Sequence, residues 1–91
     1  MPYIKQEDRK KFEDLNIKDL KMVGLLCNSS GELNYALTKI CLGYLNKLGC
    51  IRYSTINDII GVLECIKHEL YRRVVSHYED LKIKENGDVY D

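Results

Sequence analysis

A regular apolar pattern between residues 54 and 78 constrains the fold of this chain most. An α-helix of some 24 residues spans roughly 36 Å at 1.5 Å per residue, which is long for a chain of 91 residues. Ser54 or Thr55 has the residue type of an N-cap, so we expect helix over about 54–78. The pattern continues at spacings of 3, 4, 3, 4, 4 and 3 through seven residues: Ile56, Ile59, Leu63, Ile66, Leu70, Val74 and His77.

An extended arm and a further helix are predicted at the N-terminus. Residues 1–4 should form an extended arm, because Pro2 disfavours helix at the residue before it. Helix-forming residues over 5–14 predict a helix that runs on with a break near Asn16 or restarts at Ile17.

The middle of the chain predicts a longer helix. Asn28 to Gly31 is rich in turn-forming residues and reads as a loop. Residues 32–48 then carry apolar residues at helical spacing, and Gly49 suits a helix C-terminus.

The C-terminal segment, residues 79–91, is expected to be an extended or hairpin-like tail. Its Asn86-Gly87 pair is typical of turns and lies between Ile83 and Val89. We expect a terminus to pack on the domain or on a neighbouring subunit. The predicted fold is therefore all-α, a single helical domain over 1–91 with one long C-terminal helix.

The helices offer more apolar surface than so small a chain can cover. The 32–48 segment has apolar residues on a second side, including Tyr35, Leu42 and Leu45, and the long helix has Gly61 at its middle. A mid-helix glycine costs about 1 kcal/mol relative to alanine, which favours a close approach by another helix or a ligand over mere tolerance. We therefore predict a homo-oligomer, a dimer or a tetramer.

Composition excludes several functional classes. Fourteen basic and fourteen acidic residues give a formal net charge of zero, which disfavours a duplex-DNA binder. The four widely spaced cysteines lack a C-x-x-C pair and read as reduced thiols of a cytoplasmic protein rather than a zinc site. The N-terminus lacks the apolar run of a signal peptide, and no apolar run is long enough to cross a membrane.

No motif in the sequence supports catalysis or a cofactor. Glu64, His68 and Arg72 lie four residues apart on one helix face, where His68 would act as a base near neutral pH. An exposed pairing of the kind common on helices is the preferred reading. Since no phosphate-binding loop, nucleophile elbow or paired carboxylate motif occurs, we expect no enzyme.

The adjacent Arg72 and Arg73 suggest an anion-binding surface instead. Glu69 and Arg73 lie at i and i+4, so a local ion pair accounts for Arg73 and leaves Arg72 on the opposite side. Tyrosine rings stack on bases and arginine forks fit phosphates, a combination that suits a small anionic nucleotide. From the residues alone, an ordinary solvated helix end, where the helix dipole favours positive charge, is the preferred reading.

Several segments resemble a widespread family of small, largely bacteriophage-encoded proteins. They are MPYIKQEDR at the start, YSTINDIIGVLEC in the long helix, and ELYRRVVSHYED with KIKENGDVY at the end. The chain is thereby identified as similar to viral sponge proteins that counter cyclic-oligonucleotide (CBASS) immunity. The resemblance implies a helical oligomer in the cytoplasm of the infected cell that sequesters signals such as 3′,3′-cyclic GMP-AMP without degrading them.

The resemblance also implies nucleotide pockets at subunit interfaces. The alternative function is a non-enzymatic adaptor or structural phage protein, whose apolar faces and basic helix end dock a protein partner. The candidate ligand contacts are Tyr3, Lys5, Tyr71, Arg72, Arg73, Tyr78, Lys82 and Lys84.

Overall fold

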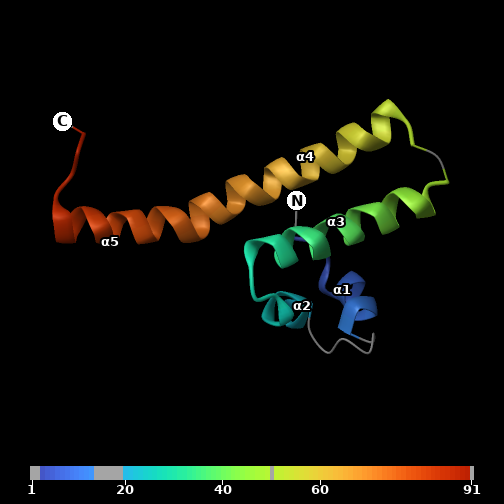
Figure 1. Ribbon diagram of the computed structural model, residues 1–91, viewed down its shortest axis with the longest axis horizontal. Helices are drawn as coiled ribbons and strands as arrows, with labels where there is room; N and C mark the ends of the chain where they lie inside the picture. The colour runs from blue at the N-terminus through green and yellow to red at the C-terminus, as the bar shows by residue number, and fades with distance from the viewer. Residues whose placement is uncertain (1–2, 14–19, 50, 91) are drawn as a thin grey trace. The chain divides into compact units, whose positions relative to one another are not determined.

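The computed structural model describes residues 3–13, 20–49 and 51–90, and the regular structure in these ranges is helical (Figure 1). The described residues contain no β-strand. The prediction of an all-α chain is therefore confirmed. The elements in chain order are α1 (Gln6–Glu13), α2 (Lys21–Leu26), α3 (Ser30–Lys47), α4 (Tyr53–Leu70), the π-helical turn η1 (Tyr71–Val75) and α5 (Ser76–Asn86).

The chain divides into two units. The first lies within Pro2–Ile56 and contains α1, α2, α3 and the first turn of α4. The second lies within Asn57–Asp91 and contains the rest of α4, η1, α5 and the C-terminal residues. The prediction of a single domain over 1–91 stays a prediction.

Helix α1 begins at Gln6, immediately after a short non-helical arm. The Asp8 N–H donates to the Lys5 carbonyl at 2.9 Å, and the Arg9 Nε donates to the Ile4 carbonyl at 2.9 Å. These bonds tie the arm to the first turn of the helix. The predicted break near Asn16 or restart at Ile17 falls outside the described residues.

Helix α3 begins with a reciprocal cap between Ser29 and Glu32. The Ser29 hydroxyl accepts the Glu32 N–H at 3.1 Å and lies 3.5 Å from the Glu32 Oε2. Ser29 has the extended backbone typical of an N-cap, with φ −151° and ψ 163°. The helix therefore starts at Ser30, two residues before the predicted start.

Replacing Ser29 by alanine removes this cap and should lower the free energy of unfolding by about 1 kcal/mol. For a chain of this size that corresponds to a fall of about 4–8 °C in melting temperature. Thermal unfolding followed by circular dichroism measures it. Ser30→Ala is the matched control, because Ser30 lies inside the first turn, where alanine is a good helix former. Equal melting temperatures for both variants would contradict the cap.

Helix α4 also begins earlier than its sequence pattern indicates. It starts at Tyr53, and Thr55 lies inside its first turn. The Thr55 Oγ1 accepts the Arg52 N–H at 3.0 Å and donates to the Arg52 carbonyl at 2.8 Å. Neither Ser54 nor Thr55 is the N-cap as predicted. Thr55 satisfies the Arg52 backbone from within the helix, as the third residue of a capping box does.

The predicted end of the long helix at about Tyr78 is wrong. The chain continues as helix through η1 and α5 to Asn86, because residues 79–85 are mostly strong helix formers (Figure 1). Gly87 ends the helix with φ 89°, and its N–H donates to the Ile83 carbonyl at 2.8 Å. Asn86-Gly87 is thus a helix terminus and not a hairpin turn. Only residues 87–90 of the described chain follow the helix.

The π turn η1 inserts one extra residue into this long helix. A hydrogen bond between residues i and i+5 encloses one residue more than the i to i+4 bond of an α-helix, and the Ser76 N–H donates to the Tyr71 carbonyl in this way. Residues that would align seven apart in an α-helix therefore align eight apart across η1. The predicted place of His77 in the apolar stripe is wrong for this reason, and Tyr78 takes it.

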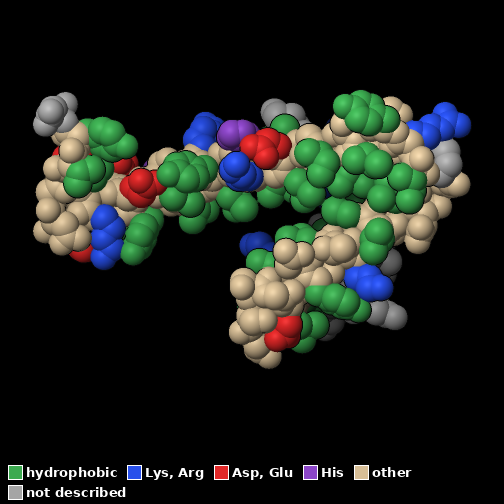
Figure 2. Space-filling view, turned by 45° about the horizontal axis from the view of Figure 1, so that its top comes forward, with side chains coloured by type: hydrophobic (Ala, Val, Ile, Leu, Met, Phe, Trp, Pro, Cys, Tyr) green, Lys and Arg blue, Asp and Glu red, His purple; other side chains and the backbone are tan. Residues whose placement is uncertain are grey.

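None of the described residues is buried in either unit. Large apolar side chains are exposed throughout, and Figure 2 shows hydrophobic side chains at the surface along the helices. No helix among the described residues combines the length and apolar character that a membrane span requires. Cys27, Cys41 and Cys65 are free thiols, while Cys50 lies outside the described residues.

Candidate anion-binding surface

The two adjacent arginines at the start of η1 have different surroundings. The Arg72 guanidinium lies 3.3 Å from the Glu69 Oε2, at spacing i, i+3. No described side chain forms an ion pair or hydrogen bond with Arg73. The predicted Glu69–Arg73 pair is therefore wrong. Residues three and four apart are both neighbours on a helix, and the prediction considered only the wider spacing.

Arg73 belongs to a row of nitrogen-bearing side chains on one side of the helix. His77 follows it by four residues, and Lys84 follows His77 by seven, so that all three share one side of the second unit. Like Arg73, His77 and Lys84 have no partner among the described residues. We call Arg73, His77 and Lys84 the basic row. His77 was not a predicted site residue, because its spacing from the apolar residues before it assigned it to the apolar stripe.

A tyrosine with a cation over its ring lies close to this row in α5. The Lys82 ammonium lies 5.5 Å from the centre of the Tyr78 ring and 3.1 Å from the Glu85 Oε2. Tyr78 and its flanking cation are both exposed. This pair can accept a planar group against the outer face of the ring, and the ammonium can contact an adjoining anion.

Tyr71, another predicted contact, is linked to Glu79 across η1. A hydrogen bond to the Glu79 carboxylate and the negative charge of that carboxylate raise the pKa of the Tyr71 phenol, and Tyr90 adds to the effect. The two residues are eight apart, which is the spacing that the π turn aligns. The contact therefore favours the protonated phenol, whose O–H donates to the Glu79 carboxylate.

The last four described residues form an open groove with the end of α5. The groove has a volume of about 250 Å³, and the Tyr90 N–H donates to the Asp88 Oδ1 at 2.9 Å within its wall. Lys82 joins the groove to the Tyr78 ring. Its lining residues are Glu79, Lys82, Ile83, Asn86, Gly87, Asp88, Val89 and Tyr90.

Two predicted contacts, Tyr3 and Lys5, belong to the first unit and are exposed in the arm before α1. The other six predicted residues lie within the second unit, between Tyr71 and Lys84. The structure thus places most of the predicted set on one helix. Within it, Tyr78 and Lys82 are in contact, and Arg72 is paired with an acid.

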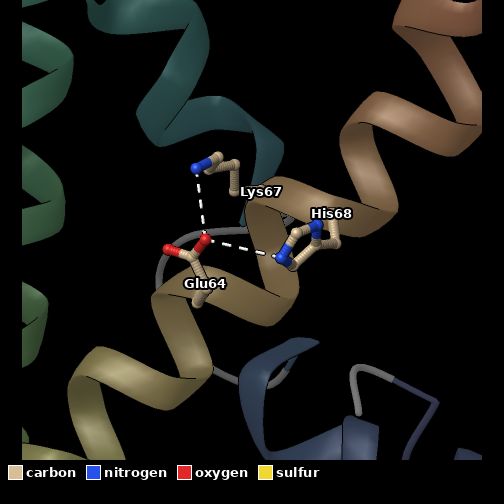
Figure 3. A network of polar contacts seen from close by, with 3 residues as sticks. All are labelled: Glu64, Lys67 and His68. Carbon is tan, nitrogen blue, oxygen red and sulfur yellow. Dashed lines mark hydrogen bonds and ion pairs between the residues drawn. The ribbon is translucent and has the colours of Figure 1, made fainter.

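The Glu64 cluster in α4 has the geometry of an exposed helix pairing (Figure 3). The Glu64 Oε1 lies 3.1 Å from the Lys67 Nζ and 3.4 Å from the His68 Nε2. All three side chains are more than half exposed. Exposed pairs of this kind contribute about 0–1 kcal/mol, and the arrangement agrees with the preferred reading of the sequence.

The chain matches a family of known sequences over almost its whole length. Residues 1–89 match the family described as Domain of unknown function (DUF6899). The chain is a DUF6899 protein. No curated protein and no solved structure matches it. Among the described side chains of the DUF6899 protein, the basic row and the Tyr78–Lys82 pair are best suited to hold an anion.

The Tyr71–Glu79 contact predicts the alkaline behaviour of the DUF6899 protein. Since the pKa of Tyr71 is raised above its ordinary value of 10.0, the contact stabilises the folded state at pH values below 10 and loses this effect as the pH rises through the raised pKa. Glu79→Gln should return the pKa of Tyr71 towards its ordinary value. Tyrosinate absorbance, with Tyr71→Phe as the subtracted reference, measures the shift. Asp80→Asn is the matched control, and an equal shift in that variant would refute the assignment.

Proposed function

We propose that this protein binds a small anionic nucleotide of the cyclic-dinucleotide class and sequesters it without chemical change. The observation that carries the proposal is the basic row, in which Arg73, His77 and Lys84 have no described partner. An arginine fork and an ammonium are the groups that hold phosphates in proteins. Among the described residues, no carboxylate forms an ion pair with any of these three side chains.

The neighbouring aromatic group supplies the second requirement of a nucleotide site. Tyr78 exposes its ring and already holds the Lys82 ammonium 5.5 Å from the ring centre. A base that stacks on such a ring gains about 1–3 kcal/mol. Tyr71 and Arg72 complete the proposed contacts within the second unit, and the homo-oligomer supplies them in duplicate for a ligand with two phosphates and two bases. Tyr3 and Lys5 of the first unit stay predicted contacts.

Sequestration requires only that the protein binds the nucleotide tightly and is abundant in the cell. Free signal falls when the protein is in excess and its dissociation constant lies below the concentration at which the host receptor responds. The resemblance to anti-CBASS sponge proteins supports this biological setting, in which a bacteriophage protein acts in the cytoplasm of the infected cell. Sequestration is consistent with a surface built from cations and rings.

Calorimetric titration with 3′,3′-cyclic GMP-AMP tests the proposal. We expect saturable binding, and intact ligand should be recovered by chromatography after the complex is denatured by heat. Linear diadenosine phosphate at the same concentration is the control for general attraction of anions. Absence of heat with all cyclic dinucleotides would reject the nucleotide class, and recovery of degraded ligand would reject sequestration.

A protein-docking adaptor is the second candidate. It is favoured by the apolar side chains on the C-terminal half of the helix, which are more than half exposed at Leu70, Val74, Tyr78 and Leu81. A stoichiometric protein partner in a pull-down, together with no nucleotide binding, would place this function first.

A further inference from the structure

The second unit has one apolar stripe that continues across the π turn. Between Ile66 and Tyr78 the apolar residues follow three successive spacings of four. In a regular α-helix these twelve residues make about 3.3 turns, and Tyr78 would lie roughly a third of a turn away from Ile66. Because η1 absorbs one residue, eleven remain, which is close to three turns. The π turn therefore keeps both residues on one face.

The C-terminal half of this stripe has no cover within its unit. Leu70, Val74, Tyr78 and Leu81 are between 55% and 59% exposed, and α4, η1 and α5 follow one another along a single helical run. A solitary amphipathic helix gains most of its stability from packing of its apolar face. We call these four residues the C-terminal stripe. Because they are exposed, packing against a partner would stabilise the helix.

The charges around the C-terminal stripe identify the kind of partner. With histidine left out of the count, residues 67–75 carry three basic side chains and one acidic side chain, whereas residues 76–90 carry four acidic and two basic side chains. The first half is thus positive and the second half negative. An antiparallel copy of the same helix would face each half with its opposite, and a parallel copy would face like charges.

We propose that a second copy of this chain covers the C-terminal stripe in an antiparallel, two-fold symmetric helix pair. A two-fold axis between Val74 and Tyr78 makes the contact self-complementary and closes the assembly at two chains. The apolar side chains interlock, and each basic half lies along the acidic half of the partner. This inference does not depend on a nucleotide, since it concerns the protein alone.

Sedimentation equilibrium of the nucleotide-free protein tests the pairing. We expect a dimer at micromolar concentration, and Val74→Asp should weaken it at least about 100-fold, because it buries an unpaired charge at the centre of the contact. Ile60→Asp is the matched control. Ile60 is 58% exposed against 59% for Val74, and it lies on another side of α4. It should leave the dimer unchanged.

Spin labels test the orientation of the pair. Asn86→Cys, in a background with the four natural cysteines replaced by serine, places one label near the end of each helix. Antiparallel pairing about the middle of the stripe separates the two labels by about 30 Å at 1.5 Å per residue, and parallel pairing brings them to about 10 Å.

Three outcomes would overturn the proposal. A monomeric wild-type protein would assign the stripe to a different partner, as the adaptor function requires. A dimer that Val74→Asp does not weaken would place the contact elsewhere, and labels about 10 Å apart would refute the antiparallel pair. Tyr78 belongs both to the C-terminal stripe and to the proposed nucleotide contacts, so the pairing is judged from sedimentation of the nucleotide-free protein and nucleotide binding from the calorimetric titration.

Discussion

Arg73→Ala should weaken binding of 3′,3′-cyclic GMP-AMP roughly 10- to 100-fold, and Arg72→Ala should weaken it much less. A hydrogen bond to a charged group contributes about 1.5–3 kcal/mol, and each 1.4 kcal/mol is a factor of ten in affinity. Arg73 has no described partner, so that its guanidinium can meet a phosphate without breaking an existing ion pair. Arg72 lies 3.3 Å from the Glu69 carboxylate, which already neutralises part of its charge.

The two arginines are well matched as a variant and its control. They are neighbours in η1, both are exposed, and each substitution removes one positive charge from the same helix turn. A general loss of attraction between protein and ligand would therefore affect both variants equally. Calorimetric titration at fixed ionic strength measures the difference, because the strength of such attraction depends on salt.

Arg73→Lys separates charge from geometry. Lysine keeps the positive charge but lacks the planar fork that holds a phosphate through two parallel hydrogen bonds. We expect an affinity between those of the wild type and Arg73→Ala. The circular dichroism of all three variants should equal that of the wild type, since the side chain is exposed. A larger loss for Arg72→Ala than for Arg73→Ala would remove the basic row from the proposed site.

Local patterns in the sequence predicted most of the helical fold. Apolar spacing identified the helices over 32–48 and 54–78. The first lies within α3 except for Leu48, its C-cap, and the second runs through α4 and η1 into α5. Their boundaries were less predictable. Ser29 and Thr55 both take part in capping, but one lies before its helix and the other inside it. The residue type alone does not distinguish these two positions, because either role satisfies one free backbone N–H.

The C-terminal error has a definite physical cause. Asn-Gly occurs at hairpin turns and at helix C-termini, because glycine adopts positive φ at low cost in both. Residues 79–85 have the helix propensity that decides between them, and this information was present in the sequence. Gly87 accordingly follows the last turn of α5.

The structure shows where the predicted site residues lie, and it corrects two details of their surroundings. The sequence indicated a basic and aromatic helix end, and six of its eight residues lie between Tyr71 and Lys84 of the second unit. It assigned Glu69 to the wrong arginine and placed His77 in the apolar stripe. The second error follows from η1, since helix-period reasoning assumes a constant 3.6 residues per turn. The sequence contained one sign of the extra residue in η1, which is the run of three successive spacings of four between the apolar residues Ile66 and Tyr78.

Deletion of Arg72 should affect the stability of the protein little, whereas insertion of an alanine after Arg72 should lower it strongly. In an ordinary α-helix both changes rotate the following residues by about 100° and are equally disruptive. Here η1 already contains one extra residue, so that the deletion allows a regular α-helix with the stripe still aligned. The insertion requires a second extra residue and turns Tyr78 and Leu81 away from Ile66 and Leu70.

Thermal unfolding and sedimentation equilibrium measure this asymmetry. The deletion should keep the melting temperature within a few degrees of the wild type and retain the dimer, because the Tyr71–Glu79 spacing of eight becomes the spacing of seven that an α-helix aligns. The insertion should lower the melting temperature by more than about 10 °C, since the exposed C-terminal stripe loses its continuity with the rest of the face. Arg72→Ala controls for the lost charge in the deletion.

The result distinguishes two roles of the π turn. If η1 exists to keep one apolar face continuous, its removal costs little and its enlargement costs much, as predicted. If η1 instead holds Arg73 and Tyr71 in place for a ligand, the deletion should retain the dimer and still abolish nucleotide binding more completely than Arg72→Ala does. Equal destabilisation by deletion and insertion would contradict both roles, because it would mean that the helix tolerates no change of register at this point.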